Sequence, residues 1–362
     1  MEGKGKLRRV FPGSNSARGF FSFFDQIIAP EDGRVLVIKG GPGIGKSTFM
    51  SKIGKALQEY GYDVEYQHCA SDSTSLDGLV VPALAVALID GTFPHVFDPP
   101  YPGVAGEIID LGRFWDAAGI REKKDRIIKL EAEIGRLFKQ AHRLLAVAET
   151  YLQALESYYG LEGILDQGAW DRLTLRLIEE ILTVKTKKSR GRVRRLFASA
   201  ITPQGFVHHL DTLIEPLAGV YLFQGEYSSG KSKIIERIMD AALWRGFNVE
   251  AYHCALDPEK IDHIIIPELN TAIINSIDPH HVTFSRVCRE IDSGEFIAGL
   301  PRELQAEKNT LDQSYSNALG EAIGFLAKAQ SVYQELEGYY IPHMHFAEVD
   351  RLCRETLERI LE

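Results

Sequence analysis

The amino-acid sequence predicts an α/β protein built from two tandem copies of one unit. Each unit is expected to be a mostly parallel, doubly wound sheet with a long helical hairpin as an insertion or extension. Three observations lead to this prediction: the second half repeats the first, short apolar runs alternate with glycine-rich turns, and each half ends in a long heptad pattern. At 362 residues and 45% hydrophobic, the chain is large enough to bury two ordinary cores.

The repeat divides the chain into units 1–186 and 187–362. Between residues 35 and 95 the two halves align without a gap at an offset of 185, and the offset is 186 upstream and 181, then 179, downstream. The aligned pairs include Gly40 with Gly225, Lys46 with Lys231, His68 with His253, Cys69 with Cys254, and His95 with His280. A duplication of this length predicts two similar folds in one chain.

The α/β part of each unit is expected to contain short buried strands. The apolar run at residues 35–38 is followed by a glycine-rich loop and a helical pattern, which is typical of a parallel strand entering a βα unit. Further strands are expected at 63–68, 78–81 and 85–89, with equivalents after residue 220. The helix after the loop has one apolar face, formed by Phe49, Met50, Ile53 and Leu57.

A helical arm is expected at about 119–186 in the first unit and about 301–362 in the second. Apolar residues in alternating steps of three and four predict one long helix with a heptad seam: Ile127, Leu130, Ile134, Leu137, Ala141, Leu144, Ala148, Tyr151, Leu155 and Tyr158. A shorter helix with Leu173, Leu177 and Ile181 follows, and the same pair recurs at roughly 303–340 and 348–361. The seam either packs against its own returning helix or its repeat mate, or binds a partner as a coiled coil.

Two segments match the Walker A pattern, in which a glycine is followed by four residues and then Gly-Lys-Ser or Gly-Lys-Thr. Glycines at these positions allow the backbone to turn successive N–H groups toward a phosphate, and the lysine and the following helix N-terminus add positive charge. The serine hydroxyl is a ligand for Mg²⁺. The residues expected to bind the phosphates are Gly40, Gly41, Gly43, Ile44, Gly45, Lys46, Ser47 and Thr48 in the first unit, and Gly225, Ser228, Ser229, Gly230, Lys231, Ser232 and Lys233 in the second.

With these two loops the chain resembles the P-loop NTPase superfamily over the α/β part of both units. It is more narrowly similar to a group of bacterial tandem P-loop proteins labelled ATPase or nucleotide kinase. The residues that carry this resemblance are the paired loops, the His-Cys pairs that begin at residues 68 and 253, and the stretch DGTFPH from Asp90. The resemblance implies ATP as the bound nucleotide.

An acidic residue that holds Mg²⁺ through water is expected at the end of an apolar strand. Asp90 follows the run ALAVALI and fits this role, although an aspartate before a glycine is also typical of a turn. Lys46, Asp90 and Lys231 are therefore the expected catalytic residues, and the expected metal ligands are Ser47, Asp90 and Ser232. The second unit has Asn275 at the position of Asp90, so the first site is expected to be the better catalyst.

Two further groups of repeated residues have a structural and a functional interpretation. His68 and Cys69, like His253 and Cys254, end a strand, where they either pack or face a ligand. Nearby carboxylates are rival positions for a catalytic role, namely Asp72, Asp77, Asp257 and Asp262.

A pair of arginines precedes each unit. Arg8 and Arg9 match Arg194 and Arg195, which end a stretch in which seven of eleven residues are basic. This stretch is either a solvated linker, the source of an arginine that reaches the phosphates of the neighbouring unit, or a nucleic-acid contact.

Composition narrows the function classes. A net charge of −9 disfavours a protein that coats nucleic acid, and no apolar stretch has the length of a membrane span or a secretory signal. The four cysteines have no paired spacing, so reduced thiols and a cytoplasmic location are expected. The leading hypothesis is an ATPase whose two units form an internal pseudo-dimer that moves the arms and acts on a partner. The alternatives are a kinase for a nucleotide or another small molecule, and a nucleotide-gated binding module with little turnover.

Overall fold

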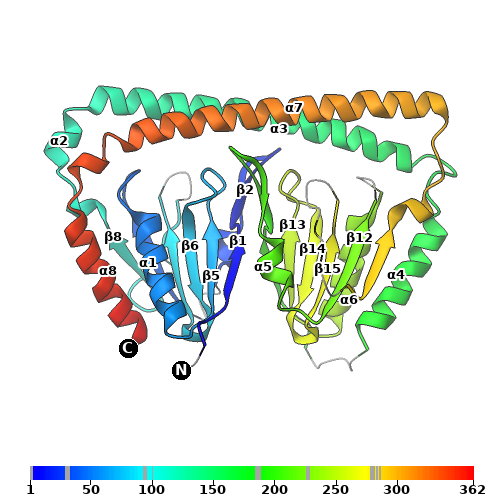
Figure 1. The fold of residues 1–362 in the computed structure, drawn as a ribbon, viewed down its shortest axis with the longest axis horizontal. Coiled ribbons are helices and arrows are strands. Elements are labelled where there is room, and N and C mark those ends of the chain that lie inside the picture. Colours follow the sequence, from blue (N-terminus) through cyan, green and yellow to red (C-terminus); the bar gives the residue numbers. More distant parts are fainter. Residues whose placement is uncertain are drawn as a thin grey trace.

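The computed structural model describes residues 3–28, 33–92, 96–99, 101–183, 189–225, 229–277, 282, 284 and 287–362. Two six-stranded sheets lie side by side beneath two long helices that run across both of them (Figure 1). The predicted α/β class with two repeated sheets is confirmed at this level. Ser228, His95 and His280 lie outside the described residues.

The first sheet has the strand order β1-β5-β6-β7-β4-β8. Its strands are β1 (Leu7–Val10), β4 (Arg34–Lys39), β5 (Val64–His68), β6 (Leu76–Val81), β7 (Val86–Asp90) and β8 (Gly106–Asp110). Only β6 pairs antiparallel with its neighbours, so the sheet is mostly parallel, as expected. The edge strands β1 and β8 were not expected from the sequence.

The second sheet repeats this order as β9-β13-β14-β15-β12-β16. Its strands are β9 (Val193–Leu196), β12 (Gly219–Gln224), β13 (Val249–His253), β14 (Ile261–Ile266), β15 (Thr271–Asn275) and β16 (Arg289–Asp292). Each unit also has a two-stranded hairpin, β2 (Gly13–Ser16) with β3 (Gly19–Ser22) in the first and β10 (Ser199–Thr202) with β11 (Gly205–His208) in the second. The predicted duplication is therefore visible strand by strand.

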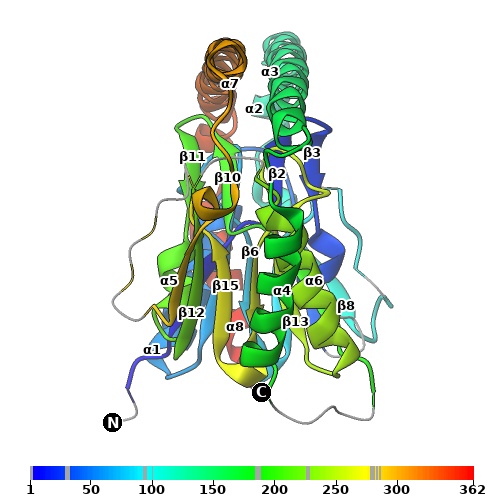
Figure 2. The ribbon, with the colours of Figure 1, turned by 90° about the vertical axis from the view of Figure 1, so that its right-hand side faces the viewer.

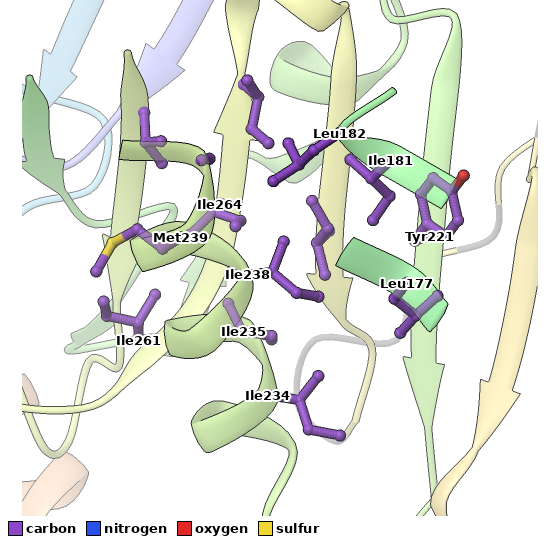
Figure 3. Packing of buried hydrophobic residues seen from close by; sticks show 14 of the residues in the cluster. Leu177, Ile181, Leu182, Tyr221, Ile234, Ile235, Ile238, Met239, Ile261 and Ile264 are labelled. Atoms are coloured by element: carbon purple, nitrogen blue, oxygen red, sulfur yellow. The ribbon is translucent and has the colours of Figure 1, made fainter. Parts of the chain in front are cut away.

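The two faces of each sheet are covered differently. One face packs against the helix after the loop, α1 (Lys46–Glu59) or α6 (Lys231–Trp244), and the expected apolar residues Phe49, Met50, Ile53 and Leu57 are all fully buried there. Figure 3 shows the equivalent packing in the second unit, where Ile234, Ile235 and Ile238 point toward the sheet. On the other face, the described residues that cover the sheet include the short helices η1 (Phe24–Gln26) and α5 (Leu210–Ile214).

The helical arms exchange between the units, which corrects the predicted hairpins. After the short helix α2 (Ala117–Arg121), α3 (Lys124–Tyr159) crosses to the second unit, where α4 (Gln167–Ile181) packs against α6. In the opposite direction α7 (Arg302–Glu337) returns to the first unit, where α8 (Phe346–Leu361) packs against α1 (Figure 1). The long helices therefore pair with each other and not with the shorter helix that follows each of them, as the end view in Figure 2 also shows.

Most of the predicted heptad positions of α3 lie in its buried seam, namely Ile127, Leu130, Leu137, Ala141, Ala148 and Leu155. At three predicted positions, Leu144, Tyr151 and Tyr158, the buried residue is the next one along the helix. Leu144 and Tyr151 are half-buried and pack at the edge of the seam. A step of four after Ala141 shifts the pattern, which keeps a nearly straight helix facing α7 along its whole length.

The two units meet along β1 and β9 and at the loops between them. Phe11 and Phe197 exchange backbone hydrogen bonds, of 2.9 Å and 3.0 Å, across the boundary. The side chain of Asn15 donates to Ile201 O at 2.9 Å, and its Oδ1 lies 3.1 Å from His142 Nε2 of α3. This buried network joins both units to the arm. Within the described part of the chain, no helix has the length and apolar character of a membrane span.

Candidate functional site

The first glycine-rich loop joins β4, an inner strand of the sheet, to the N-terminus of α1. Gly43 and Gly45 have backbone φ angles of 67° and 91°, which are unfavourable for residues with a side chain. A Cβ at Gly40 would lie 1.9 Å from Ile44 Cδ1, and Ile44 is fully buried. The loop is therefore anchored in the core by one side chain and leaves no room for others.

Lys46 lies inside this loop. Its Nζ donates to Gly41 O at 2.7 Å and lies 3.6 Å from Asp90 Oδ2, and the side chain is only 9% exposed. Asp90 ends β7, next to β4 in the sheet, and this neighbour relation brings the carboxylate to the loop. The structure thus joins two of the expected catalytic residues in one ion pair.

Asp90 takes part in a turn and also lies beside the loop, which were the two alternatives expected for it. Its Oδ1 accepts hydrogen bonds from Thr92 N at 3.0 Å and Thr92 Oγ1 at 2.5 Å, as in a turn. Its Oδ2 faces Lys46. Ser47 Oγ accepts from Leu76 N at 2.9 Å, while Thr48 is exposed. One carboxylate oxygen therefore faces the lysine, and the Ser47 hydroxyl is held by the first residue of β6.

Cys69 and Asp77 lie behind Asp90. In the antiparallel register of β6 and β7, Gly78 is opposite Ile89, which places Asp77 opposite Asp90 at the next position. Burial raises the pKa of the Cys69 thiol well above its usual range, and the Asp77 carboxylate adds to the shift. The raised pKa favours the protonated thiol of Cys69.

Asp72 caps its own turn, because it accepts hydrogen bonds from Thr74 Oγ1 at 2.8 Å and Ser75 Oγ at 2.6 Å. In the part of the chain that the structure describes, no three His, Cys, Asp or Glu residues are grouped to hold a metal ion.

His68 turns away from the loop toward the other unit. Its Nδ1 lies 2.9 Å from Ser73 O, and its ring packs against Phe11 and against His209, with centroids 6.0 Å and 4.5 Å away. Burial lowers the pKa of His68 to about 4, so the ring is neutral at pH 7. In the second unit His253 packs against Phe23 and Phe197 in the same way. The geometry supports the structural interpretation of both histidines.

Arg8 and Arg194 also lie between the units and not at the loops. Arg8 makes two hydrogen bonds to Glu250, at 3.1 Å and 2.6 Å, and Arg194 makes two to Glu65, at 3.0 Å and 2.6 Å. Burial opposes the ionisation of Glu65, but Arg194 and Arg8 outweigh it, and the pKa of Glu65 is lowered. Each arginine does reach the neighbouring unit, where it meets a carboxylate and not a phosphate loop.

The described ends of the second loop also have glycines with positive φ and a buried lysine. Gly225 and Gly230 have φ angles of 99° and 86°, and Lys231 is 2% exposed with its Nζ 3.0 Å from Ser229 Oγ. Ser232 is half-buried at the start of α6, and Lys233 is exposed. The loop thus keeps its buried lysine at the helix N-terminus.

Asn275 replaces the carboxylate of Asp90 in the second unit, whereas the carboxylate of Asp77 is retained there as Asp262. Asp262 on β14 hydrogen-bonds to Asn275 and to Cys254, and burial raises the pKa of Asp262 to about 6. The two loops are therefore unequal in charge, as the sequence predicted.

Residues of the exchanged arms cover both loops, which was not predicted. Trp170 of α4 donates its indole N–H to Ser229 O at 2.9 Å and stacks on Phe296 with centroids 4.5 Å apart. At the first loop, a Cβ on Gly41 would lie 3.0 Å from Tyr340 Cε1. The repeated glutamates and tyrosines at the ends of the two long helices were the available signal, but the sequence does not reveal which unit they meet.

Comparisons with protein-family models, with curated proteins and with solved structures found no match.

Proposed function

We propose that the chain binds Mg²⁺ and ATP at both glycine-rich loops and hydrolyses ATP mainly at the first. The observation that carries this proposal is the combination of left-handed glycines, a buried lysine and a helix N-terminus at the end of an inner strand, found twice in equivalent places. Backbone N–H groups, the helix dipole and the lysine each favour an anion with several negative oxygens.

Two features of the first loop support phosphate binding there. A Cβ at Gly40 would lie 1.9 Å from Ile44 Cδ1, so glycine is needed for the tight turn of the backbone, and Lys46 lies within reach of the loop and of Asp90. Ser47 and Asp90 would hold Mg²⁺, which prefers oxygen ligands and keeps several waters, so a larger protein cluster is not required. The ion supplies neutralisation of the charge that develops on the transferred phosphoryl group.

For the second loop the same reasoning favours binding with slow turnover. Lys231 and the glycines are retained, but Asn275 offers no negative charge for a metal. Because the arms cross between the units, occupancy of one loop would shift the position of helices from the other half. We infer that this movement, within a pseudo-dimer of the two units, acts on a partner in the cytoplasm, where the four free cysteines would stay reduced.

Separate substitutions of the two lysines test the proposal. Lys46→Ala and Lys231→Ala should each remove one of two nucleotides in titration calorimetry with Mg·ATP, and Lys46→Ala should abolish most ADP release. Adding nucleoside monophosphates, then nucleic acid, to the ADP-release assay distinguishes a hydrolase from a kinase. If well-folded protein takes up neither Mg·ATP nor Mg·GTP, the proposal is refuted. If turnover depends on Lys231 alone, the ranking of the two sites is wrong.

A further inference from the structure

The last turn of α7, which begins in the second unit, lies directly against the first glycine-rich loop. A Cβ on Gly43 would lie 3.1 Å from Glu337 Cβ and 3.2 Å from Glu337 O, and 3.0 Å from Ile341 Cγ1. Tyr340 makes the equally close approach to Gly41. The loop is therefore in van der Waals contact with a helix that the other half of the chain contributes.

The carboxylate of Glu337 interacts with the part of the loop that would hold a phosphate. The side chain of Glu337 starts beside Gly43, and both the Gly43 N–H and the Lys46 cation favour the ionised form of its carboxylate. Burial raises the pKa of Glu337, and Asp72 adds to the shift, while Gly43 and Lys46 oppose it. A carboxylate oxygen on a loop amide resembles a phosphate oxygen in charge and in hydrogen bonding.

We propose that Glu337 is an affinity-determining residue of the first nucleotide site, because its carboxylate takes the place of a phosphate oxygen at the Gly43 amide. The last turn of α7 must then move away from the loop before the loop binds a triphosphate. This inference rests on the proposed function, and it adds that the first site is closed by a residue from the other half. Nucleotide binding and displacement of the arm are then thermodynamically coupled.

The repeat supplies an internal comparison. Glu156 at the end of α3 is the equivalent of Glu337, and it forms an ion pair with Lys260, which also lies 3.7 Å from Asp257. The position of Lys260 is occupied by Ser75 in the first unit, whose hydroxyl donates to Asp72. The glutamate at the end of α3 therefore has a lysine as its ion-pair partner, whereas the position of that lysine is a serine in the first unit.

The contacts of α7 would transmit such a displacement to the rest of the protein. α7 contacts α3 along most of its length and also contacts β10 of the second unit. Movement of its last turn therefore pulls on a helix pair that packs on both units. The coupling does not require any contact between the two nucleotides.

The test uses the full chain with Lys231→Ala, so that only the first site is titrated with Mg·ATP by calorimetry. Glu337→Gln keeps the size of the side chain but removes its charge, and it should bind Mg·ATP roughly tenfold more tightly, the value of one charge-assisted hydrogen bond. Glu337→Ala should bind at least as tightly. The matched control is Glu156→Gln, which should leave the affinity of the first site unchanged. Circular dichroism and melting curves establish that each variant is folded.

The outcomes separate the inference from the proposed function. If the parent binds Mg·ATP and both Glu337 variants bind it equally or more weakly, the inference is wrong while the proposed function stands. If Glu337→Gln loses turnover at an unchanged dissociation constant, Glu337 belongs to the reaction and the competition is refuted. If neither the parent nor the Glu337 variants bind nucleotide, both proposals fail. Binding that is detected only in the Glu337 variants supports the inference.

Discussion

The two units differ at His209, a titratable residue whose equivalent in the first unit is Phe23. His209 packs on His68 with ring centroids 4.5 Å apart and planes at 42°. Its equivalent Phe23 packs on His253 at 4.7 Å and 46°. Because a phenylalanine occupies the same geometry in the other half, we expect His209→Phe to be accommodated without repacking.

The pKa of His209 sets how much stability the protein loses in acid. Burial, together with nearby His68 and Arg9, lowers this pKa from 6.5 to about 4. The folded state keeps this ring neutral, whereas the unfolded chain takes up a proton below pH 6.5. Stability is therefore unaffected above pH 6.5 and is lost as the pH falls toward 4. At pH 5 the full cost is about 2 kcal/mol, and we discount it to about 1 kcal/mol because the side chain is only half-buried.

Urea unfolding followed by circular dichroism at pH 8 and pH 5 measures this effect. The stability of His209→Phe relative to the wild type should rise by about 1 kcal/mol between pH 8 and pH 5. The reverse substitution Phe23→His is the matched control, because it places a second histidine beside His253 and should increase the loss of stability in acid. An equal difference between His209→Phe and the wild type at both pH values would refute the reasoning.

Two further substitutions each replace one acidic residue by asparagine, the first at the first site and the second in the buried sheet of the second unit. Asp90→Asn gives the first site the side chain that the second has in Asn275, and it should lower ATP turnover by about 10- to 100-fold while calorimetry still detects binding, because the charge that orients Mg²⁺ is lost. An unchanged rate would indicate that Asp72 or Asp77, and not Asp90, orients Mg²⁺. Asp262→Asn should stabilise the protein at pH 7 by up to about 3 kcal/mol but hardly at pH 4, because the pKa of Asp262 is raised by burial to about 6 and the cost of ionising it grows between pH 4 and pH 6. Urea midpoints at the two pH values measure this difference, and parallel shifts would contradict it.

Much of each unit was predictable from local patterns. The offset of the repeat indicated two similar sheets, and the apolar spacing of Phe49, Met50 and Ile53 identified the buried face of α1. The glycine spacing indicated both loops, because backbone positions with positive φ favour glycine. The position of Asp90 at a strand end followed in the same way.

The choice of partners was decided only by the tertiary structure. The apolar stripes of α4 and α8 do not indicate which copy of the repeat they meet, since α1 and α6 both present an apolar face. A helix of 36 residues is about 54 Å long, which is enough to reach the far unit. That length carries Glu337 to the loop of the other half. The arginines Arg8 and Arg194 likewise meet glutamates because β1 and β9 face each other. Sequence spacing determines what lies on one face of an element, and packing between elements determines what that face meets.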